Sequence, residues 1–481
     1  MQNNYCELSP DLKISRIISG LWQVADLERD GKRTDHQKMA QAMEAYAKAG
    51  FTTFDMADHY GSAELIAGQF RKQHQGDPVQ LLTKWVPKPG QTTENEVREA
   101  VERALTRLQV SRIDLLQFHA WNYADPNYLD CLFWLQELKE EGLISNLGLT
   151  NFDTAHLRVV VKSGIEVVSN QVCYSLLDQR AAKSMQKYCL ENDIKLLAFG
   201  TLAGGFLSKR WLHKPEPELN EKLSWSQMKY LRFIHAAGGW QKFQELLTVL
   251  EEVAESHQVS ISNVASRYIL DDPAVGGVII GARPGLSDHI GDNSKMLDLR
   301  LNESAKSSIR TALDNLSPIP GDCGGEYRKP PFLTASGDLS HHVEEIPPPY
   351  PAHAVKGGKT KALSGTVWED IAGFSRAVRK GNRILVSGTT ATHGVRAIGG
   401  DDPAAQMHFI IDKIEGAIQS LGGRLDDVVR TRIYVRDPDQ WEAISRAHGE
   451  RFATIQPANT LISAELIGEG YLVEMEAEAQ L

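Results

Sequence analysis

Four polar side chains in the N-terminal half are of types that could together reduce a carbonyl group: Asp55, Tyr60, Lys84 and His119. Tyr60 could protonate a carbonyl oxygen, but an unperturbed phenol has a pKa of about 10 and is a poor acid at neutral pH. A neighbouring ammonium favours the phenolate and lowers that pKa, and Lys84 could supply it. Asp55 could balance a buried lysine charge, and His119 could hydrogen-bond the carbonyl oxygen.

The sequence around these residues predicts the elements that must hold them together. Short apolar runs, each followed by a polar loop and an amphipathic stretch such as 94–108, recur eight times. The runs lie at 14–18, 52–55, 80–84, 113–119, 146–151, 166–171, 195–199 and 277–281. Such alternation is typical of parallel strands covered by helices on both faces. Eight units over roughly 300 residues favour a (β/α)₈ TIM barrel, in which the ends of the strands form the active site. Asp55, Lys84 and His119 stand at such ends.

The same segments carry a family resemblance. Residues 54–64, Phe-Asp-Met-Ala-Asp-His-Tyr-Gly-Ser-Ala-Glu, resemble the aldo-keto reductase signature, and Thr83-Lys84 and Gln117-Phe118-His119 resemble its lysine and histidine segments. The resemblance implies an NAD(P)H-dependent oxidoreductase that reduces an aldehyde or ketone to an alcohol. Tyr60 would be the general acid/base, Lys84 would lower its pKa, Asp55 would pair with Lys84, and His119 would position the carbonyl. No metal is implied.

The resemblance also implies a cofactor site, for NADPH rather than NADH. Thr150, Asn151 and Gln171 match positions that bind the nicotinamide carboxamide, and Phe199 matches an aromatic residue that stacks on nicotinamide. The remaining expected cofactor positions are Gly200, Thr201, Leu202, Gly204, Gly281, Arg283, His289 and Asn293. Arg283 is the candidate for the 2′-phosphate, because a guanidinium forks onto phosphate oxygens. The spacing from Gly281 to His289 and Asn293 is longer than in the family.

Aromatic residues in the loops predict the shape of the substrate pocket. Trp22 follows the first strand and Trp121 follows His119, and we expect both to form pocket walls. An aromatic-lined pocket suits an apolar or ring-containing carbonyl compound.

Proline and glycine divide the chain after the barrel. The barrel is expected over 1–317, a Pro/Gly-rich linker over 318–363, and a small α+β domain over 364–481. Proline removes backbone donors and fixes φ, so the linker is predicted to contain neither a helix nor a central strand. Residues 330–333 could instead pack on the barrel as an ordered strap. The small domain has strand patterns at 384–388, 428–435 and 472–479, and helix patterns at 407–421 and 440–452.

The small domain resembles the RidA family, also called YjgF or L-PSP. The matching segments are 384–388, 421–430 and 472–479. The resemblance implies a homotrimer with ligand sites between subunits. Family members that hydrolyse imines keep an arginine after Pro-Ala, where this chain has Asn459, so a strong carboxylate contact is lost. Glu474 matches the family's glutamate, and Arg446 could restore a positive charge. A ligand-binding or trimerising module is therefore favoured over an imine hydrolase.

Composition restricts the alternatives. A formal net charge of -10 over 481 residues argues against nucleic-acid or anionic-membrane partners. The N-terminus lacks a signal-peptide pattern, and no apolar run is long enough for a membrane span, so a cytoplasmic protein is expected. Two other functions stay open: an NADPH-binding redox sensor with little turnover, and an NAD(P)-dependent sugar or alcohol dehydrogenase. The fusion also permits a sequence in which the small domain releases a carbonyl from an imine and the barrel reduces it.

Overall fold

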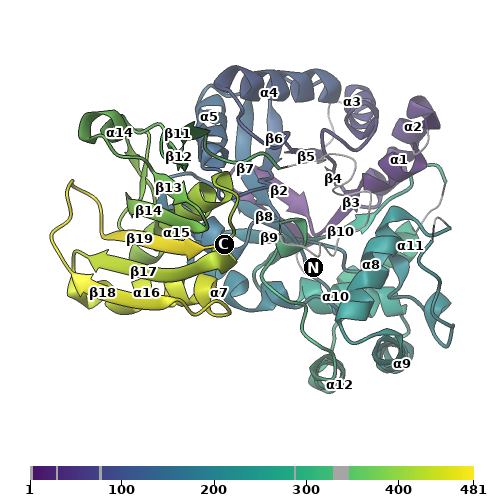
Figure 1. The fold of residues 1–481 in the computed structure, drawn as a ribbon. Helices are drawn as coiled ribbons and strands as arrows, with labels where there is room; N and C mark the ends of the chain where they lie inside the picture. The colour runs from purple at the N-terminus through teal and green to yellow at the C-terminus, as the bar shows by residue number, and fades with distance from the viewer. Residues whose placement is uncertain (1–3, 29–30, 75–78, 221, 287–288, 329–345) are drawn as a thin grey trace.

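Eight parallel strands form a closed barrel in the N-terminal part of the computed structural model (Figure 1). The structure describes residues 4–28, 31–74, 79–220, 222–286, 289–328 and 346–481. The strands are β3 (Ile17–Gly20), β4 (Thr53–Asp55), β5 (Gln80–Trp85), β6 (Ile113–Phe118), β7 (Ile144–Thr150), β8 (Ser169–Cys173), β9 (Lys195–Phe199) and β10 (Val275–Gly281). Each pairs with the next in chain order, and β10 closes the barrel on β3. The predicted TIM barrel is confirmed.

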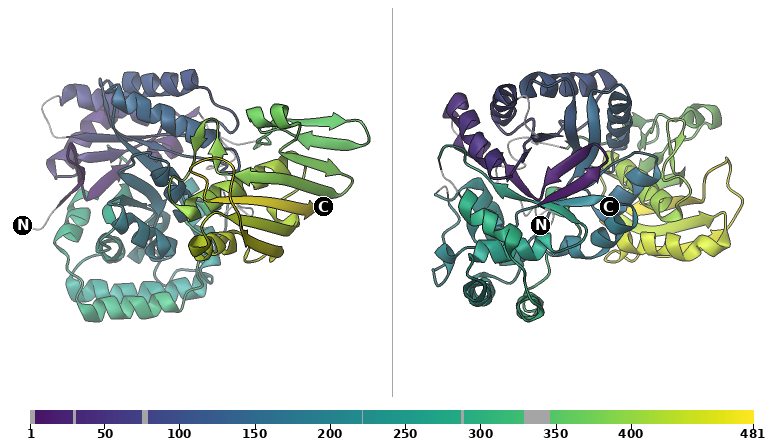
Figure 2. Two further views of the ribbon diagram at one scale, coloured as in Figure 1. Left: turned by 90° about the vertical axis from the view of Figure 1, so that its left-hand side faces the viewer. Right: turned by 180° about the vertical axis from the view of Figure 1, so that it is seen from behind.

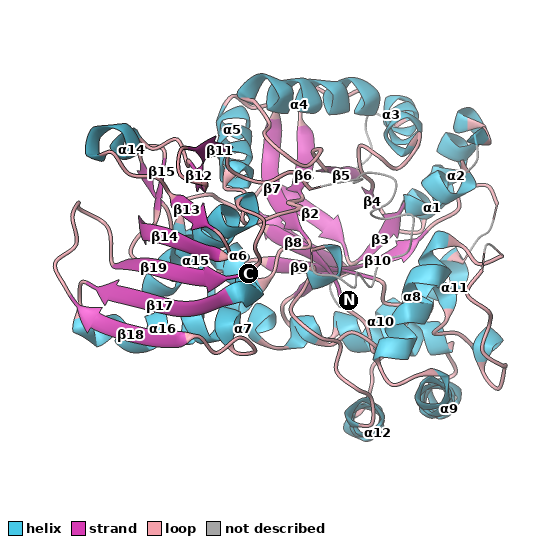
Figure 3. Cartoon of the chain, viewed as in Figure 1, coloured by secondary structure: helices cyan, strands magenta, loops and turns pink. Residues whose placement is uncertain are grey.

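Helices surround the barrel strands (Figure 3). They are α1 (Trp22–Leu27), α2 (His36–Lys48), α3 (Ala63–Gln73), α4 (Glu94–Leu108), α5 (Asn127–Glu140), α6 (Thr154–Lys162), α7 (Ser184–Glu191), α8 (Trp225–Ala236), α9 (Trp240–His257), α10 (Ile261–Leu270), α11 (Ile290–Asp298) and α12 (Glu303–Asp314). The helix α4 has the bounds that its apolar spacing predicts. Thr93 and Glu96 form a capping box at its start, which satisfies free N–H groups of the first turn. None of the described helices is long and apolar enough to cross a membrane.

The first expected strand, at 14–18, is two elements rather than one. Residues Leu12–Ser15 form β2, which pairs antiparallel with β1 (Tyr5–Ser9), and the barrel strand β3 begins only at Ile17. The hairpin closes the amino end of the barrel with an apolar cluster. Its members are Leu8, Leu12, Ile14, Ile18, Leu82, Leu115 and Leu197. Residues 14–18, Ile-Ser-Arg-Ile-Ile, contain no glycine or proline that would mark a turn, so the sequence alone does not reveal the bend at Arg16.

The C-terminal domain is a seven-stranded sheet with two long helices on one face. Its strands lie in the order β11 (Ala352–Val355), β12 (Lys359–Ala362), β13 (Ala377–Lys380), β14 (Arg383–Thr390), β19 (Val473–Gln480), β17 (Val428–Val435) and β18 (Ala458–Ser463). The short strands β15 (Thr392–His393) and β16 (Arg396–Ala397) pair with each other. The helices are α14 (Val367–Ala372), α15 (Pro403–Ser420) and α16 (Trp441–Phe452). The predicted α+β domain is confirmed.

Two strands of this sheet lie within the segment expected to be a linker. Strand β12 pairs antiparallel with both β11 and β13, so it is a central strand and the prediction of none between 318 and 363 is wrong. The sheet begins at Ala352 rather than after residue 363. The prolines of this segment do not prevent strand formation, because the last of them is Pro351, which precedes β11. Strand β11 is also an edge strand, where proline is tolerated. Residues 330–333, the candidate for an ordered strap, lie outside the described residues.

The helix α15 lies between the C-terminal sheet and the barrel helix α6 (Figure 2). Nearly all of its side chains are buried, as expected for a helix that is covered on opposite sides. Polar contacts cross the same interface. Arg158 donates to Asp402 at 2.7 Å, and His156 Nε2 lies 2.9 Å from Asp412 Oδ2. The two domains are therefore packed against each other through their helices, and none of the described residues covers the opposite face of the C-terminal sheet.

Candidate active site

Asp55 and Lys84 form a buried ion pair at the carboxyl ends of neighbouring strands. Lys84 Nζ donates to Asp55 Oδ2 at 2.5 Å and to the carbonyl oxygen of Met56 at 2.9 Å. The second carboxylate oxygen, Oδ1, accepts from Gln117 Nε2 at 3.1 Å and from Gln171 Nε2 at 2.7 Å. The carboxylate thus has donors on both oxygens, which is what a buried charge requires.

The ammonium of Lys84 also lies beside Tyr60. Its Nζ is 5.0 Å from the centroid of the Tyr60 ring, whose edge packs on Trp22 at a centroid distance of 4.9 Å. Burial lowers the pKa of Lys84, and the Asp55 carboxylate opposes that shift. A positive charge beside a phenol stabilises negative charge on its oxygen. The role of Lys84 toward Tyr60 stays a prediction.

His119 is buried next to the carboxyl end of β6. Its Nδ1 lies 3.3 Å from the carbonyl oxygen of Thr150, and its Nε2 is buried without a hydrogen-bond partner in the part of the chain that the structure describes. Burial, and next the charge of Arg328, hold the pKa of His119 well below its usual value, so the ring is neutral. A neutral ring can donate from Nε2 to a carbonyl oxygen or accept there from a hydroxyl, depending on the tautomer.

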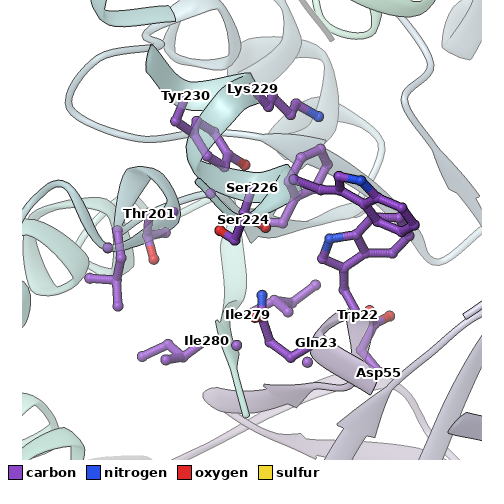
Figure 4. A pocket seen from close by; sticks show the side chains of 18 of the residues that line it. Trp22, Gln23, Asp55, Thr201, Ser224, Ser226, Lys229, Tyr230, Ile279 and Ile280 are labelled. Carbon is purple, nitrogen blue, oxygen red and sulfur yellow. The ribbon is translucent and has the colours of Figure 1, made fainter. Parts of the chain in front are cut away.

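A cavity of about 710 Å³ brings together the side chains predicted for the barrel. It is lined by the four candidate catalytic residues, by Trp22 and Trp121, and by every predicted cofactor position from Thr150 to Asn293. Figure 4 shows Ser224, Ser226, Lys229 and Tyr230, at the start of α8, across the cavity from Trp22 and Gln23. The cavity therefore extends from Tyr60 and His119 to Arg283.

The residues present fit a nicotinamide dinucleotide. Asn151 Oδ1 is buried without a hydrogen-bond partner among the described residues, and a carboxamide could donate to it. Gly200 and Gly204 have φ of 77° and 65°, a region that favours glycine, so the backbone bends along the cavity wall without side chains. At the far end the guanidinium of Arg283 is exposed, and its Nη2 donates to Gln23 Oε1 at 3.0 Å. A cationic group there suits a phosphate.

Among the residues in and beside the cavity that are absent from the sequence-based set are Lys229, Tyr327 and Arg328. Lys229 Nζ is buried and donates to the hydroxyl of Tyr327 at 2.6 Å, and the Tyr327 ring lies 5.6 Å from the His119 ring. Arg328 follows directly. Tyr327 and Arg328 stand in the Pro/Gly-rich segment, where no periodic pattern marks a functional residue, so neither could be predicted from the sequence. Only the return of this segment across the barrel places them at the site.

The three residues proposed for the second domain are not brought together within one chain. Asn459 accepts from Thr431 Oγ1 at 3.1 Å, on the sheet face that packs against α16. Glu474 points to the opposite face, since its neighbours Val473 and Met475 are buried under the helices. Arg446 is exposed on α16 and pairs with Glu442. Within one chain the sheet therefore separates Arg446 from Glu474, and their joint site between subunits stays a prediction.

Comparison with known proteins agrees with this geometry. Residues 16–314 match the sequence model of the aldo/keto reductase family, and residues 366–481 match that of endoribonuclease L-PSP. The chain is 27% identical to aldo-keto reductase YhdN of Bacillus subtilis, over 66% of this chain and 96% of that protein. Its C-terminal part is 37% identical to an uncharacterized protein of Streptomyces coelicolor, over 25% of this chain and 90% of that protein.

Among solved structures, the glycerol dehydrogenase of Gluconobacter oxydans has the same barrel fold. It has a TM-score of 0.54 and 21% identity, and the match covers 67% of this chain and 98% of that one. With the matched family segment covering more than half of the residues, this chain belongs to the aldo/keto reductase family of oxidoreductases and carries a RidA-like domain at its C-terminal end.

Proposed function

We propose that the barrel transfers a hydride between NADPH and a small aldehyde or ketone, with Tyr60 as the general acid. The observation that carries this proposal is the single cavity in which Tyr60, Lys84 and His119 face the predicted nicotinamide positions. When bound, the reduced nicotinamide supplies the hydride to the carbonyl carbon. The chain's own residues handle the proton and the charge that this transfer requires.

Proton transfer is the part that the side chains perform. In the proposed complex the carbonyl oxygen accepts from the Tyr60 hydroxyl and from His119 in the tautomer that carries its proton on Nε2, the ring nitrogen without a partner among the described residues. Tyr60 donates its proton to this oxygen as negative charge develops there. Lys84 stabilises the phenolate that remains, and Asp55 holds Lys84 in place. Trp22 and Trp121 line the cavity beside Tyr60 and His119 and reduce the access of water.

The test compares turnover of NADPH with a panel of aldehydes and ketones in the wild type, Tyr60→Phe and Tyr188→Phe. Losing a general acid lowers kcat by about a hundredfold or more, so Tyr60→Phe is expected to lose activity and keep NADPH binding. Tyr188 is the matched control, because its hydroxyl is buried on α7 without a partner in the described residues. Tight NADPH binding without turnover in the wild type would favour the redox sensor instead.

For the RidA-like domain we propose a structural role: it holds the chain in a homotrimer through the sheet face opposite α15. This face carries exposed Leu385 and Ile462 among the ion pairs Arg383–Glu478 and Arg432–Glu476. The helical face is covered by the barrel, so the sheet is the surface left for partners. The resemblance to RidA proteins supports three copies.

A further inference from the structure

Residues 322–328 lie across the carboxyl end of the barrel, although they follow the segment that matches the family model. They are called the strap below and are distinct from residues 330–333. The carboxylate of Asp322 accepts from Thr154 N at 2.8 Å, and its carbonyl oxygen accepts from Arg180 Nη1 at 2.9 Å. Gly324 has φ of 75°, and a Cβ there would stand 1.9 Å from the carbonyl oxygen of Asn151. The strap is thus in direct backbone contact with the loop that carries a predicted cofactor residue.

The guanidinium of Arg328 joins the two loops that carry His119 and Asn151. Its Nε and Nη2 donate to the carbonyl oxygen of Ala120, at 3.0 and 2.6 Å, and Ala120 follows His119 directly. Its Nη1 donates to the carbonyl oxygen of Asn151 at 2.6 Å and to that of Gly324 at 3.0 Å. A planar guanidinium has donors in a fixed fork, so these bonds set the distance between the loops.

Arg328 packs on an aromatic stack that extends to the RidA-like domain. The guanidinium carbon lies 4.2 Å from the centroid of the Tyr123 ring. The ring of His156 stacks on the Tyr123 ring with the centroids 3.5 Å apart, and His156 in turn contacts Asp412 of α15. The RidA-like domain therefore supports the barrel residue against which Arg328 packs.

Arg328 also affects the site through its charge. After burial, it is the largest cause that keeps the pKa of His119 well below the usual value. Removing the guanidinium would thus make His119 easier to protonate, in addition to releasing the loops.

We propose that Arg328 is a positioning residue of the reductase site, which holds the loops of His119 and Asn151 in register for the carbonyl and the nicotinamide. The inference rests on the proposed function. Arg328 itself does not face the reacting atoms; it acts through backbone carbonyl oxygens. Displacement of a reacting geometry by about 1 Å can cost about a hundredfold in rate, which sets the scale of the expected effect.

The test uses the full chain with Arg328→Met and Arg328→Lys, and Arg16→Met as the matched control. Arg16 also donates to two backbone carbonyl oxygens, those of Leu270 and Val275, but at the opposite end of the barrel. We expect Arg328→Met to lower kcat by roughly 10- to 100-fold, and Arg328→Lys, which keeps the charge without the fork, to lie between it and the wild type. The apparent pKa of the acidic limb of the pH profile should rise in Arg328→Met and not in Arg16→Met.

A second measurement does not depend on turnover. Amide hydrogen exchange of the cofactor-free protein should become faster in Arg328→Met over residues 119–123 and 151–153, and stay unchanged there in Arg16→Met. If the wild type reduces no carbonyl compound, the proposed function fails. Exchange and NADPH binding then still test whether Arg328 holds the two loops. The proposal would be overturned if kcat and the exchange rates of Arg328→Met lay within twofold of those of Arg16→Met and the apparent pKa of the acidic limb were the same in both.

Discussion

Asp55 is the residue on which the electrostatics of the site depend. It accepts from Lys84 on one oxygen and from Gln117 and Gln171 on the other, in surroundings where both charges are almost fully buried. Taking two charges out of water is costly, and the cost is offset only while both partners are present. The pair is therefore better explained by the need for an ammonium beside Tyr60 than by a gain in stability.

A double-mutant cycle on the pair tests this view. Asp55→Asn leaves a buried ammonium without its counter-charge and is expected to cost about 3 to 5 kcal/mol of unfolding free energy. The double variant Asp55→Asn, Lys84→Met removes both charges and should recover part of that loss, although it stays inactive. Denaturant unfolding measures all four proteins, and purely additive single effects would contradict a coupled pair.

Arg283 is expected to decide between the two nicotinamide cofactors. A hydrogen bond to a charged group contributes about 1.5 to 3 kcal/mol, so Arg283→Met should weaken NADPH binding by about 10- to 100-fold. NADH, which lacks the 2′-phosphate, should bind equally well to both proteins. Arg310→Met, on the exposed face of α12, is the control, and titration of cofactor fluorescence gives the affinities. An equal loss for NADPH and NADH would assign Arg283 to another part of the cofactor.

At the scale of elements, α15 shows how closely the two domains pack. It touches the barrel at Gly416, where a Cβ would stand 2.4 Å from the carbonyl oxygen of Ala124. A helix normally loses stability at glycine, so glycine is used here because the approach of another backbone leaves no room for a side chain. The helix is thus shaped for the interface as well as for its own sheet.

Two glycine-to-alanine variants in neighbouring helices separate these effects. Gly416→Ala forces Cβ against Ala124 and is expected to cost about 1 to 3 kcal/mol, as overpacking does. Gly449→Ala, on α16, meets nothing within 4 Å and should stabilise the domain by about 0.5 to 1 kcal/mol. Chemical unfolding followed by circular dichroism measures both. Stabilisation by both substitutions would show that α15 does not pack this closely in solution.

At the scale of the whole molecule, a buried charge cluster joins the domains. His156 lies between Asp153, at 2.6 Å, and Asp412, at 2.9 Å, and Asp412 also accepts from Arg451. Burial works against the charged imidazole, but the two carboxylates outweigh it and raise the pKa of His156. Burial likewise opposes the charge of Asp412, yet His156 and then Arg451 lower its pKa.

The cluster makes domain packing depend on pH. Because the pKa of His156 is raised in the folded state, its charge contributes fully to stability at pH values below the unfolded histidine pKa of about 6.5. This contribution is lost as the pH rises through the folded pKa. The lowered pKa of Asp412 stabilises above about 3.9 and is lost as pH falls through its folded pKa. We expect the difference in melting temperature between wild type and His156→Gln to be largest between these two values and to shrink in alkali. A difference that is constant from acid to alkali would contradict the charged state of His156.

Assembly is the other property of the whole molecule. Leu385→Glu places a charge on the uncovered sheet face and is expected to convert the trimer to smaller species, because charges are depleted from interface centres. Leu190→Glu on α7 is the control, since Leu190 is 45% exposed and Leu385 is 46% exposed. Light scattering after size exclusion gives the masses. A wild-type monomer, or an unchanged trimer in Leu385→Glu, would place the interface elsewhere or remove it.

The barrel, the catalytic candidates and the small domain could all be predicted from the amino-acid sequence. Strand and helix periods are local, and the ends of parallel strands meet at one edge, so the positions of Asp55, Lys84 and His119 along the chain were enough to group them. The bounds of α4 and β17 follow from spacing alone. The hairpin at the amino end was missed because no glycine or proline marks the bend at Arg16.

The features that could not be predicted from the sequence depend on contacts between segments that are far apart along the chain. The strap and Arg328 reach the active site from the Pro/Gly-rich stretch, where no pattern marks them. The sheet face on which Arg446, Asn459 and Glu474 lie depends on strand register, which their spacing in the sequence does not report. His156 and Asp412, 256 residues apart, meet only because α15 packs on α6. Periodicity fixes which face of an element is buried, but not which other element covers it.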